Sequence, residues 1–226
     1  MKFQKFYAKR FLSPQFDSYG IGQTVIKPWH IELFGPSIRA GSFNTFIAAQ
    51  DKKVRLSVWS DNPDAKGITI GNYCLICPGV RISAAAEINV HDSVMLASGV
   101  YVTDADWHEI YDRGTPIGTT SPVTLEENVW VGDSCIVCKG VTIGRNSIIG
   151  AGSVVVSDIP PDSIAVGNPA RVVKQLDTTR EMRTRAHWLA DPRKLSADFD
   201  SMDRDALKNN SVLDWIRSIV KPGTKD

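Results

Sequence analysis

The feature that most constrains this chain is an aliphatic residue that recurs at intervals of six, with two interruptions. The series starts at Ile70, stops after Val102 and resumes from Leu125 to Val155. A period of six matches neither the 3.6-residue period of an amphipathic helix nor the alternation of a half-buried strand. The members of the series are Ile70, Ile76, Ile82, Val90, Leu96, Val102, Leu125, Val131, Val137, Ile143, Ile149 and Val155.

Each six-residue unit is expected to form one short strand and one corner, so that three units complete one triangular turn of a parallel β-helix. The aliphatic side chain points into the prism and stacks on its equivalent in the next turn, about 4.8 Å away. Small residues such as Gly132 and Gly144 follow the aliphatic positions, where the backbone must bend sharply. One unit cannot bury its own face, so the fold depends on the stacking of several turns.

Residues 25–69 carry a weaker form of the pattern, which predicts one or two imperfect turns. Their expected inward-facing residues are Phe34, Ile38, Ala40, Phe43, Val54, Leu56 and Val58.

Residues 68–176 resemble the hexapeptide-repeat acyltransferases. The most specific part begins at Asn128-Val129-Trp130-Val131-Gly132 and closes with Gly167-Asn168-Pro169-Ala170-Arg171. This ending is similar to that of the maltose and galactoside O-acetyltransferases. The resemblance implies an all-β fold, a left-handed parallel β-helix, and a homotrimer with active sites between its subunits.

We predict a helical extension after the repeat, with helices over residues 181–190 and 211–220, a break at Pro192 and an N-cap at Asn210. The predicted regions are an N-terminal segment 1–24, the β-helix 25–176 with an inserted loop 104–122, and the C-terminal extension 177–226.

The composition argues against binding to nucleic acid and against a membrane-spanning segment. The net charge of +1 lacks the basic excess of a nucleic-acid-binding surface. No apolar run has the length of a membrane span. The aromatic residues of the N-terminal segment are expected to pack on the body of the protein rather than to bind a membrane surface. We therefore expect a cytoplasmic protein with a small-molecule substrate.

The interruption after Val102 contains the strongest candidate for chemistry. The step from Val102 to Leu125 is 23 residues long, so about 17 residues have been inserted into the repeat. Long loops on a rigid scaffold commonly carry function. His108 lies in this loop, and an imidazole suits the base that must activate a hydroxyl group near neutral pH.

The resemblance also points to His108, because the related acetyltransferases carry their catalytic histidine on the corresponding loop. Counted from the preceding strand without gaps, the family's histidine corresponds to Trp107. A one-residue insertion in this chain is needed to align it with His108. Asp106 and Glu109 could orient the imidazole or could be solvated. Trp107 and Tyr111 could wall the acceptor site or hold the loop.

The resemblance implies acetyl-CoA as the co-substrate, bound along the later turns of the coil. Its pantetheine arm would contact small or exposed residues of these turns, and its phosphates would meet two cations near the C-terminal end of the repeat. Lys174 stands where the sugar acetyltransferases often have arginine, so the charge remains but the planar fork does not. The implied binding residues are Asp133, Gly150, Ala151, Val156, Arg171 and Lys174.

The cysteines form two pairs with CxxC spacing, Cys74/Cys77 and Cys135/Cys138, which elsewhere often bind zinc. In the register of the repeat the pairs fall on different faces, with a turn between them. Four sulfurs so arranged cannot surround one tetrahedral ion. We therefore expect buried thiols and no metal. His91 is expected to be structural.

The sequence thus predicts an acetyl-CoA-dependent O-acetyltransferase that acts on a sugar or a similar hydroxyl acceptor by direct transfer, with a role in polysaccharide biosynthesis. Two alternatives stay open: N-acetyl transfer to an amino sugar, and a non-catalytic β-helix scaffold. A zinc hydratase on the same fold needs three convergent histidines, and only His91 and His108 lie in the repeat.

Overall fold

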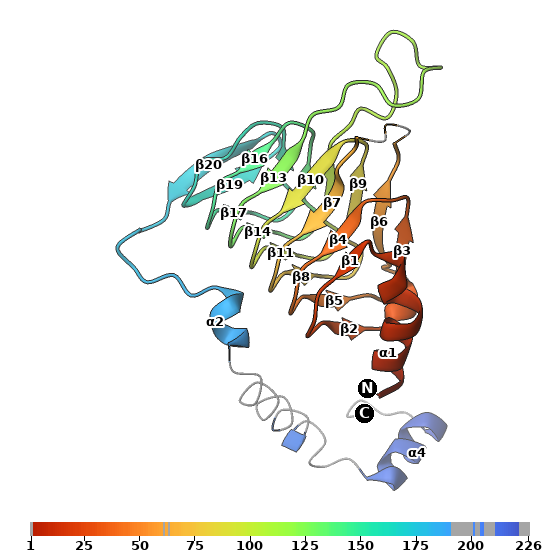
Figure 1. Cartoon of the computed structure of the whole chain (residues 1–226). Helices are drawn as coiled ribbons and strands as arrows, with labels where there is room; N and C mark the ends of the chain where they lie inside the picture. Colours follow the sequence, from red (N-terminus) through yellow and green to blue (C-terminus); the bar gives the residue numbers. More distant parts are fainter. Residues whose placement is uncertain are drawn as a thin grey trace. The chain divides into compact units, whose positions relative to one another are not determined.

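The computed structural model shows short strands stacked into three sheets, and the chain passes from sheet A to B to C in each turn (Figure 1). All pairings between successive turns are parallel in the part of the chain described. This arrangement is the parallel β-helix that the six-residue period predicts. The structure describes residues 2–60, 62, 64–190, 201, 204–205 and 211–221.

The sheets have the following strands within the described residues. Sheet A contains β1 (Ser18–Tyr19), β4 (Ile38–Ala40), β7 (Gly67–Ile70), β10 (Glu87–Val90), β13 (Val123–Leu125) and β16 (Thr142–Ile143). Sheet B contains β2 (Thr24–Ile26), β5 (Thr45–Ile47), β8 (Leu75–Ile76), β11 (Met95–Leu96), β14 (Trp130–Val131), β17 (Ile148–Ile149), β19 (Ser163–Gly167) and β20 (Ala170–Gln175). Sheet C contains β3 (Ile31–Phe34), β6 (Val54–Val58), β9 (Arg81–Ala84), β12 (Tyr101–Thr103), β15 (Ile136–Val137) and β18 (Val154–Val155).

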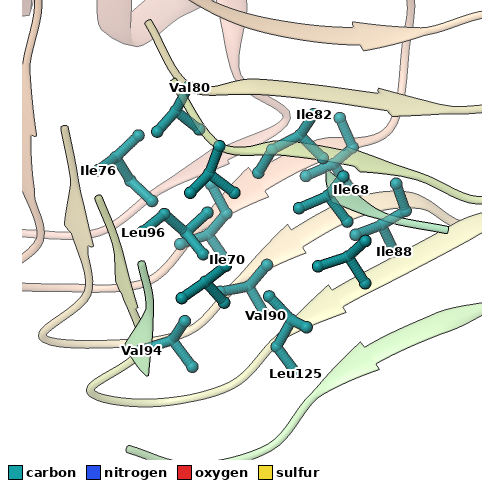
Figure 2. Packing of buried hydrophobic residues seen from close by; sticks show 14 of the residues in the cluster. Ile68, Ile70, Ile76, Val80, Ile82, Ile88, Val90, Val94, Leu96 and Leu125 are labelled. Atoms are coloured by element: carbon teal, nitrogen blue, oxygen red, sulfur yellow. The ribbon is translucent and has the colours of Figure 1, made fainter. Parts of the chain in front are cut away.

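The recurring aliphatic residues form the core. Ile70, Val90, Leu125 and Ile143 stand in register on successive strands of sheet A, and each is at most 2% exposed. Figure 2 shows the side chains of Ile70, Val90 and Leu125 converging with those of the other sheets inside the prism. Every member of the series is buried to the same degree, so the predicted core is confirmed.

The first turns follow the predicted pattern in part. Val54, Leu56 and Val58 are buried in β6, and Ile38 and Ala40 are buried in β4. The prediction is wrong for Phe34, which is 53% exposed, and for Phe43, which sits at a corner with φ 59°. Strand β1 precedes residue 25, so the coil extends into the predicted N-terminal segment.

The chain before the coil is helical and packs through a few residues. It consists of α1 (Lys2–Tyr7), a π-helix (Ala8–Leu12) and a 3₁₀ helix (Ser13–Gln15), and another 3₁₀ turn spans Pro28–His30. Leu12 and Phe16 are buried against the core, whereas Phe3 and Phe6 are exposed. Among the described residues, no helix combines the length and the apolar character that crossing a membrane requires.

The far end of the coil closes with a hairpin, in which β19 pairs with β17 on one side and antiparallel with β20 on the other. Beyond it lie α2 (Arg185–Leu189) and α4 (Val212–Val220). Helix α2 begins later than the predicted helix over 181–190. The predicted break at Pro192 and the N-cap at Asn210 lie outside the described residues. Residues 1–186 and 187–226 form two compact units.

Candidate functional site

The inserted loop leaves sheet C after β12 and projects beyond the stacked strands before it enters β13 (Figure 1). Its two arms pair with each other through antiparallel bridges, Ala105 with Thr120 and His108 with Pro116. The Gly118 amide donates to the Asp106 carbonyl at 2.8 Å, which adds to this pairing. The loop is therefore an irregular hairpin with internal backbone hydrogen bonds.

A buried carboxylate joins the base of this loop to the preceding turn. The Asp104 side chain is fully buried and accepts hydrogen bonds from the backbone amides of Ala85, Ala86 and Glu87, at 2.7, 2.8 and 2.7 Å. The amides of Ala85 and Ala86 belong to the bend between β9 and β10, and Glu87 begins β10. Asp104 thus provides acceptors for backbone N–H groups at a corner of the coil and fixes where the loop begins.

Two further contacts hold the first arm of the loop. Lys139, which follows β15 in the next turn, approaches the Asp106 carboxylate to 2.8 Å. The indole N–H of Trp107 donates to the Tyr101 hydroxyl at 3.1 Å. Trp107 therefore holds the loop, whereas Tyr111 is 95% exposed. Of the two roles considered for these aromatic residues, the structure supports the loop-holding role for Trp107.

His108 follows directly on these held residues and is exposed. Within the described residues, its imidazole makes no hydrogen bond to a neighbour. Glu109 accepts from the amides of Tyr111 and Asp112, and these hydrogen bonds lower the pKa of its carboxyl. The Asp106 carboxylate pairs with Lys139, and the Glu109 carboxylate accepts from backbone amides of the loop. Neither carboxylate therefore orients the imidazole. The imidazole faces solvent.

The predicted coenzyme residues of the coil are partly brought together. We call the bends that join a sheet B strand to the next sheet C strand the B–C corners; they include residues 77–80, 97–100, 132–135 and 150–153. Asp133 and Ala151 lie at neighbouring B–C corners, where the Gly152 amide donates to the Asp133 carbonyl at 2.8 Å. Both residues are exposed.

The other predicted coenzyme residues lie elsewhere. Val156 follows β18, at the opposite end of the sheet C strand, on the same side of the prism as the inserted loop. Arg171 and Lys174 lie on β20 of the terminal hairpin and are exposed. The short strands of sheet C thus separate Asp133 and Ala151 from Val156 and the loop, so these residues border one face of the prism.

Gly150 has a packing role that accounts for its small size. A Cβ atom added there would lie 2.6 Å from Cγ1 of Val166 on β19. The terminal hairpin therefore closes directly over Gly150. Gly152, by contrast, needs its φ of 71° for the corner, and a Cβ atom added at that position would meet no atom of the described residues within 4 Å.

The cysteines flank strands of different sheets, as predicted. Cys74 and Cys77 border β8 in sheet B, and Cys135 and Cys138 border β15 in sheet C. Burial raises the pKa of all four thiols, that of Cys74 to about 12. Among the described residues, no three His, Cys, Asp or Glu side chains are grouped closely enough to hold a metal ion.

Sequence reasoning missed the residues that hold the loop. Asp104 stands two positions after a core residue, where a buried carboxylate breaks the pattern, and this signal was available in the sequence. Lys139 and Tyr101 carried no such signal, because their pairing with loop residues depends on which strands become neighbours. Tyr101 also lies beneath the guanidinium of Arg81, whose Cζ is 4.3 Å from the ring centroid.

Residues 122–157 match the family model described as bacterial transferase hexapeptide (six repeats). Together with the three-sided coil, this match confirms the predicted left-handed parallel β-helix and the resemblance to hexapeptide-repeat acyltransferases. The galactoside O-acetyltransferase of Escherichia coli strain K12 is 37% identical over 110 residues, which cover 49% of this chain and 45% of that protein.

The chain is also similar to two solved structures. A maltose O-acetyltransferase from Clostridium difficile 630 has 28% identity, covers 78% of this chain and 79% of its own, and has a TM-score of 0.44. A galactoside acetyltransferase in complex with coenzyme A has 23% identity and a TM-score of 0.46, and the match covers 78% of this chain and 73% of that chain. The chain spans less than half the length of the curated relatives that it matches.

Proposed function

We propose that this chain, which carries the bacterial transferase hexapeptide repeat, is an acetyl-CoA-dependent O-acetyltransferase that acts on a sugar or a similar hydroxyl acceptor. The observation that carries the proposal is the exposed imidazole of His108 on a loop that Asp104, Asp106 and Trp107 hold against the coil. The similarity to a galactoside O-acetyltransferase supports the same reaction class.

His108 acts as the general base in this proposal. A ring nitrogen of its imidazole accepts the proton of the acceptor hydroxyl while the oxygen attacks the thioester carbonyl. Backbone N–H groups stabilise the resulting oxyanion. The carbon–sulfur bond then breaks, and the CoA thiolate leaves and takes the proton back from the imidazolium. The products are the acetyl ester and free CoA.

Acetyl-CoA binds along the C-terminal turns of the coil in this proposal. Its pantetheine arm follows the B–C corners at Asp133, Gly150 and Ala151 and reaches Val156. Arg171 and Lys174 meet its phosphates, which as anions need such cations. The exposed positions of these side chains on β20 support this assignment.

The state of the thiols supports direct transfer. Because burial raises the pKa of each cysteine, the thiolate that a covalent acyl-enzyme needs is disfavoured at neutral pH. We therefore assign a ternary-complex mechanism. The predicted cytoplasmic location and role in polysaccharide biosynthesis stay predictions.

The function is tested by offering purified protein acetyl-CoA with matched hydroxyl and amino sugars and measuring release of free CoA thiol. We expect thiol release with a hydroxyl acceptor, an ester product by mass spectrometry, and intersecting double-reciprocal plots. Product only from the amino sugar would assign N-acetyl transfer. Parallel plots would contradict direct transfer, and a protein that binds no CoA and releases no thiol would be a scaffold.

We also propose that the chain forms a homotrimer through the outer face of sheet B. This face carries an apolar row in register across successive strands, and Trp130 in it is 45% exposed. Contiguous exposed apolar surface commonly marks an interface. The row contains Leu75, Met95, Trp130, Ile148 and Ile164.

Sedimentation equilibrium is expected to give three times the chain mass of 24.8 kDa for the wild type and a smaller species for Trp130→Lys, because a buried unpaired charge disrupts an interface. Thr124→Lys on the outer face of sheet A is the matched control and should remain trimeric. A wild-type mass of one chain would contradict the proposal.

A further inference from the structure

A groove of about 300 Å³ opens on the prism beside the first B–C corners. Its wall includes the stacked corner glycines Gly79 and Gly99, which have positive φ angles of 82° and 72° and no side chain to cover the backbone. Its remaining lining is mostly long and cationic, from Lys52, Lys53, Arg55 and Arg81. The volume falls at the lower end of the range for small-molecule sites.

The groove carries a surplus of positive charge. Asp51 is the carboxylate among its lining residues. Outside the lining, Glu32 pairs with both Lys53 and Arg55, which leaves Lys52 and Arg81 without a carboxylate partner in the part of the chain described. Lys52 reaches the Ser98 hydroxyl at 3.3 Å. Arg81 lies over the Tyr101 ring and keeps its in-plane N–H donors for a ligand.

The groove is continuous with the proposed coenzyme path. Backbone hydrogen bonds join successive B–C corners: the Gly79 amide donates to Lys52, the Gly99 amide to Pro78, the Ser134 amide to Ser98 and the Gly152 amide to Asp133. One row of corners therefore leads from the groove to the corners at which Asp133 and Ala151 lie.

The groove is also joined to the catalytic loop. Arg81 stacks on Tyr101, and the Tyr101 hydroxyl accepts from Trp107, the neighbour of His108. Arg55, Arg81 and Tyr101 stand in register on the outer face of sheet C. A molecule held in the groove would thus lie on the outer face of sheet C, at the opposite end of its short strands from the loop.

We propose that this groove binds an anionic group of the acceptor, a phosphate or a carboxylate on the saccharide, through Arg81 and Lys52. The inference rests on the proposed acetyl transfer and adds the charge of its substrate. The planar guanidinium of Arg81 presents the donors that pair with two oxygens of such a group. Acetyl-CoA takes the C-terminal part of the same row of corners.

The test compares glucose, glucose 6-phosphate and glucuronate as probes, both for binding by saturation-transfer NMR and as acceptors with acetyl-CoA. We expect the anionic sugars to bind and glucose not to bind measurably. Arg81→Gln should lower the affinity for the anionic sugars about 10- to 100-fold, the effect of losing a charged hydrogen-bonding partner. Lys52→Gln, which leaves the Tyr101 stacking intact, should also weaken binding.

Arg39→Gln is the matched control, because Arg39 is an exposed arginine on the outer face of β4 in sheet A. It should leave anion binding unchanged. Equal binding of neutral and anionic sugars, no binding of either anion, or an Arg81→Gln effect on the KM of acetyl-CoA alone would overturn the inference. Anion binding that depends on Arg81, without thiol release, would support the groove and refute the acetyl transfer instead.

Discussion

Replacement of His108 by alanine is expected to lower kcat for acetyl transfer by about 10²- to 10⁴-fold, because it removes the group that accepts the acceptor proton. The imidazole is exposed and makes no hydrogen bond within the described residues, so the fold should not depend on it. The thermal midpoint and the Kd for CoA should therefore stay close to the wild-type values. Thiol release under saturating acetyl-CoA measures the effect.

His91→Ala is the matched control for this variant. His91 is also exposed, but it sits at a corner of the coil, and the contacts of its backbone to Leu125 and Cys74 do not involve the imidazole. Its replacement should leave kcat unchanged. Equal activity of His108→Ala and the wild type would show that another group is the base, whereas equal losses in both variants would point to a general effect of histidine removal.

Replacement of Asp104 by alanine is expected to destabilise the protein by about 3–5 kcal/mol, the range for leaving several backbone donors unsatisfied. The change leaves the amides of Ala85, Ala86 and Glu87 without their acceptor inside the protein. Each buried unsatisfied donor costs about 1–3 kcal/mol. Urea denaturation, followed by circular dichroism, measures the shift in midpoint.

Asp106→Ala is the control for Asp104, since it removes a carboxylate two residues along the same loop. Its ion pair with Lys139 is about one-third exposed on both sides, and such a pair contributes about 0–1 kcal/mol. Asp104→Asn, which keeps one acceptor oxygen, should fall between the two variants. If Asp104→Ala were no less stable than Asp106→Ala, the carboxylate would not support the corner.

The core of this protein was predictable from the sequence because the β-helix repeats one local unit. An inward position in one turn is inward in the next, so the period alone identified residues such as Leu96 and Val131, both fully buried. The prediction failed at Phe34 and Phe43, where the spacing is irregular and aromatic residues also occur outside the prism. The inward aromatic residue of this region is instead Phe46 on β5, which is 1% exposed.

The candidate site was predictable only as far as the insertion that holds His108. The contacts that support the loop were not predictable, because Asp104 accepts hydrogen bonds from a bend about 18 residues earlier and Asp106 pairs with Lys139, 33 positions later. Such pairs depend on which turns of the coil become neighbours. Hydrogen bonds between turns leave no regular spacing in the sequence from which they could be predicted.

The sequence by itself determined the repeating unit, the core and the place of the inserted loop, since each follows from local spacing and from the burial of aliphatic side chains. Only the tertiary structure decided which polar groups meet across turns. It joined Arg81 to Tyr101 and Trp107, and it aligned the corner at Lys52 with that at Asp133. The physical reason is that stacked strands hold residues of successive turns about 4.8 Å apart, however far apart those residues are along the chain.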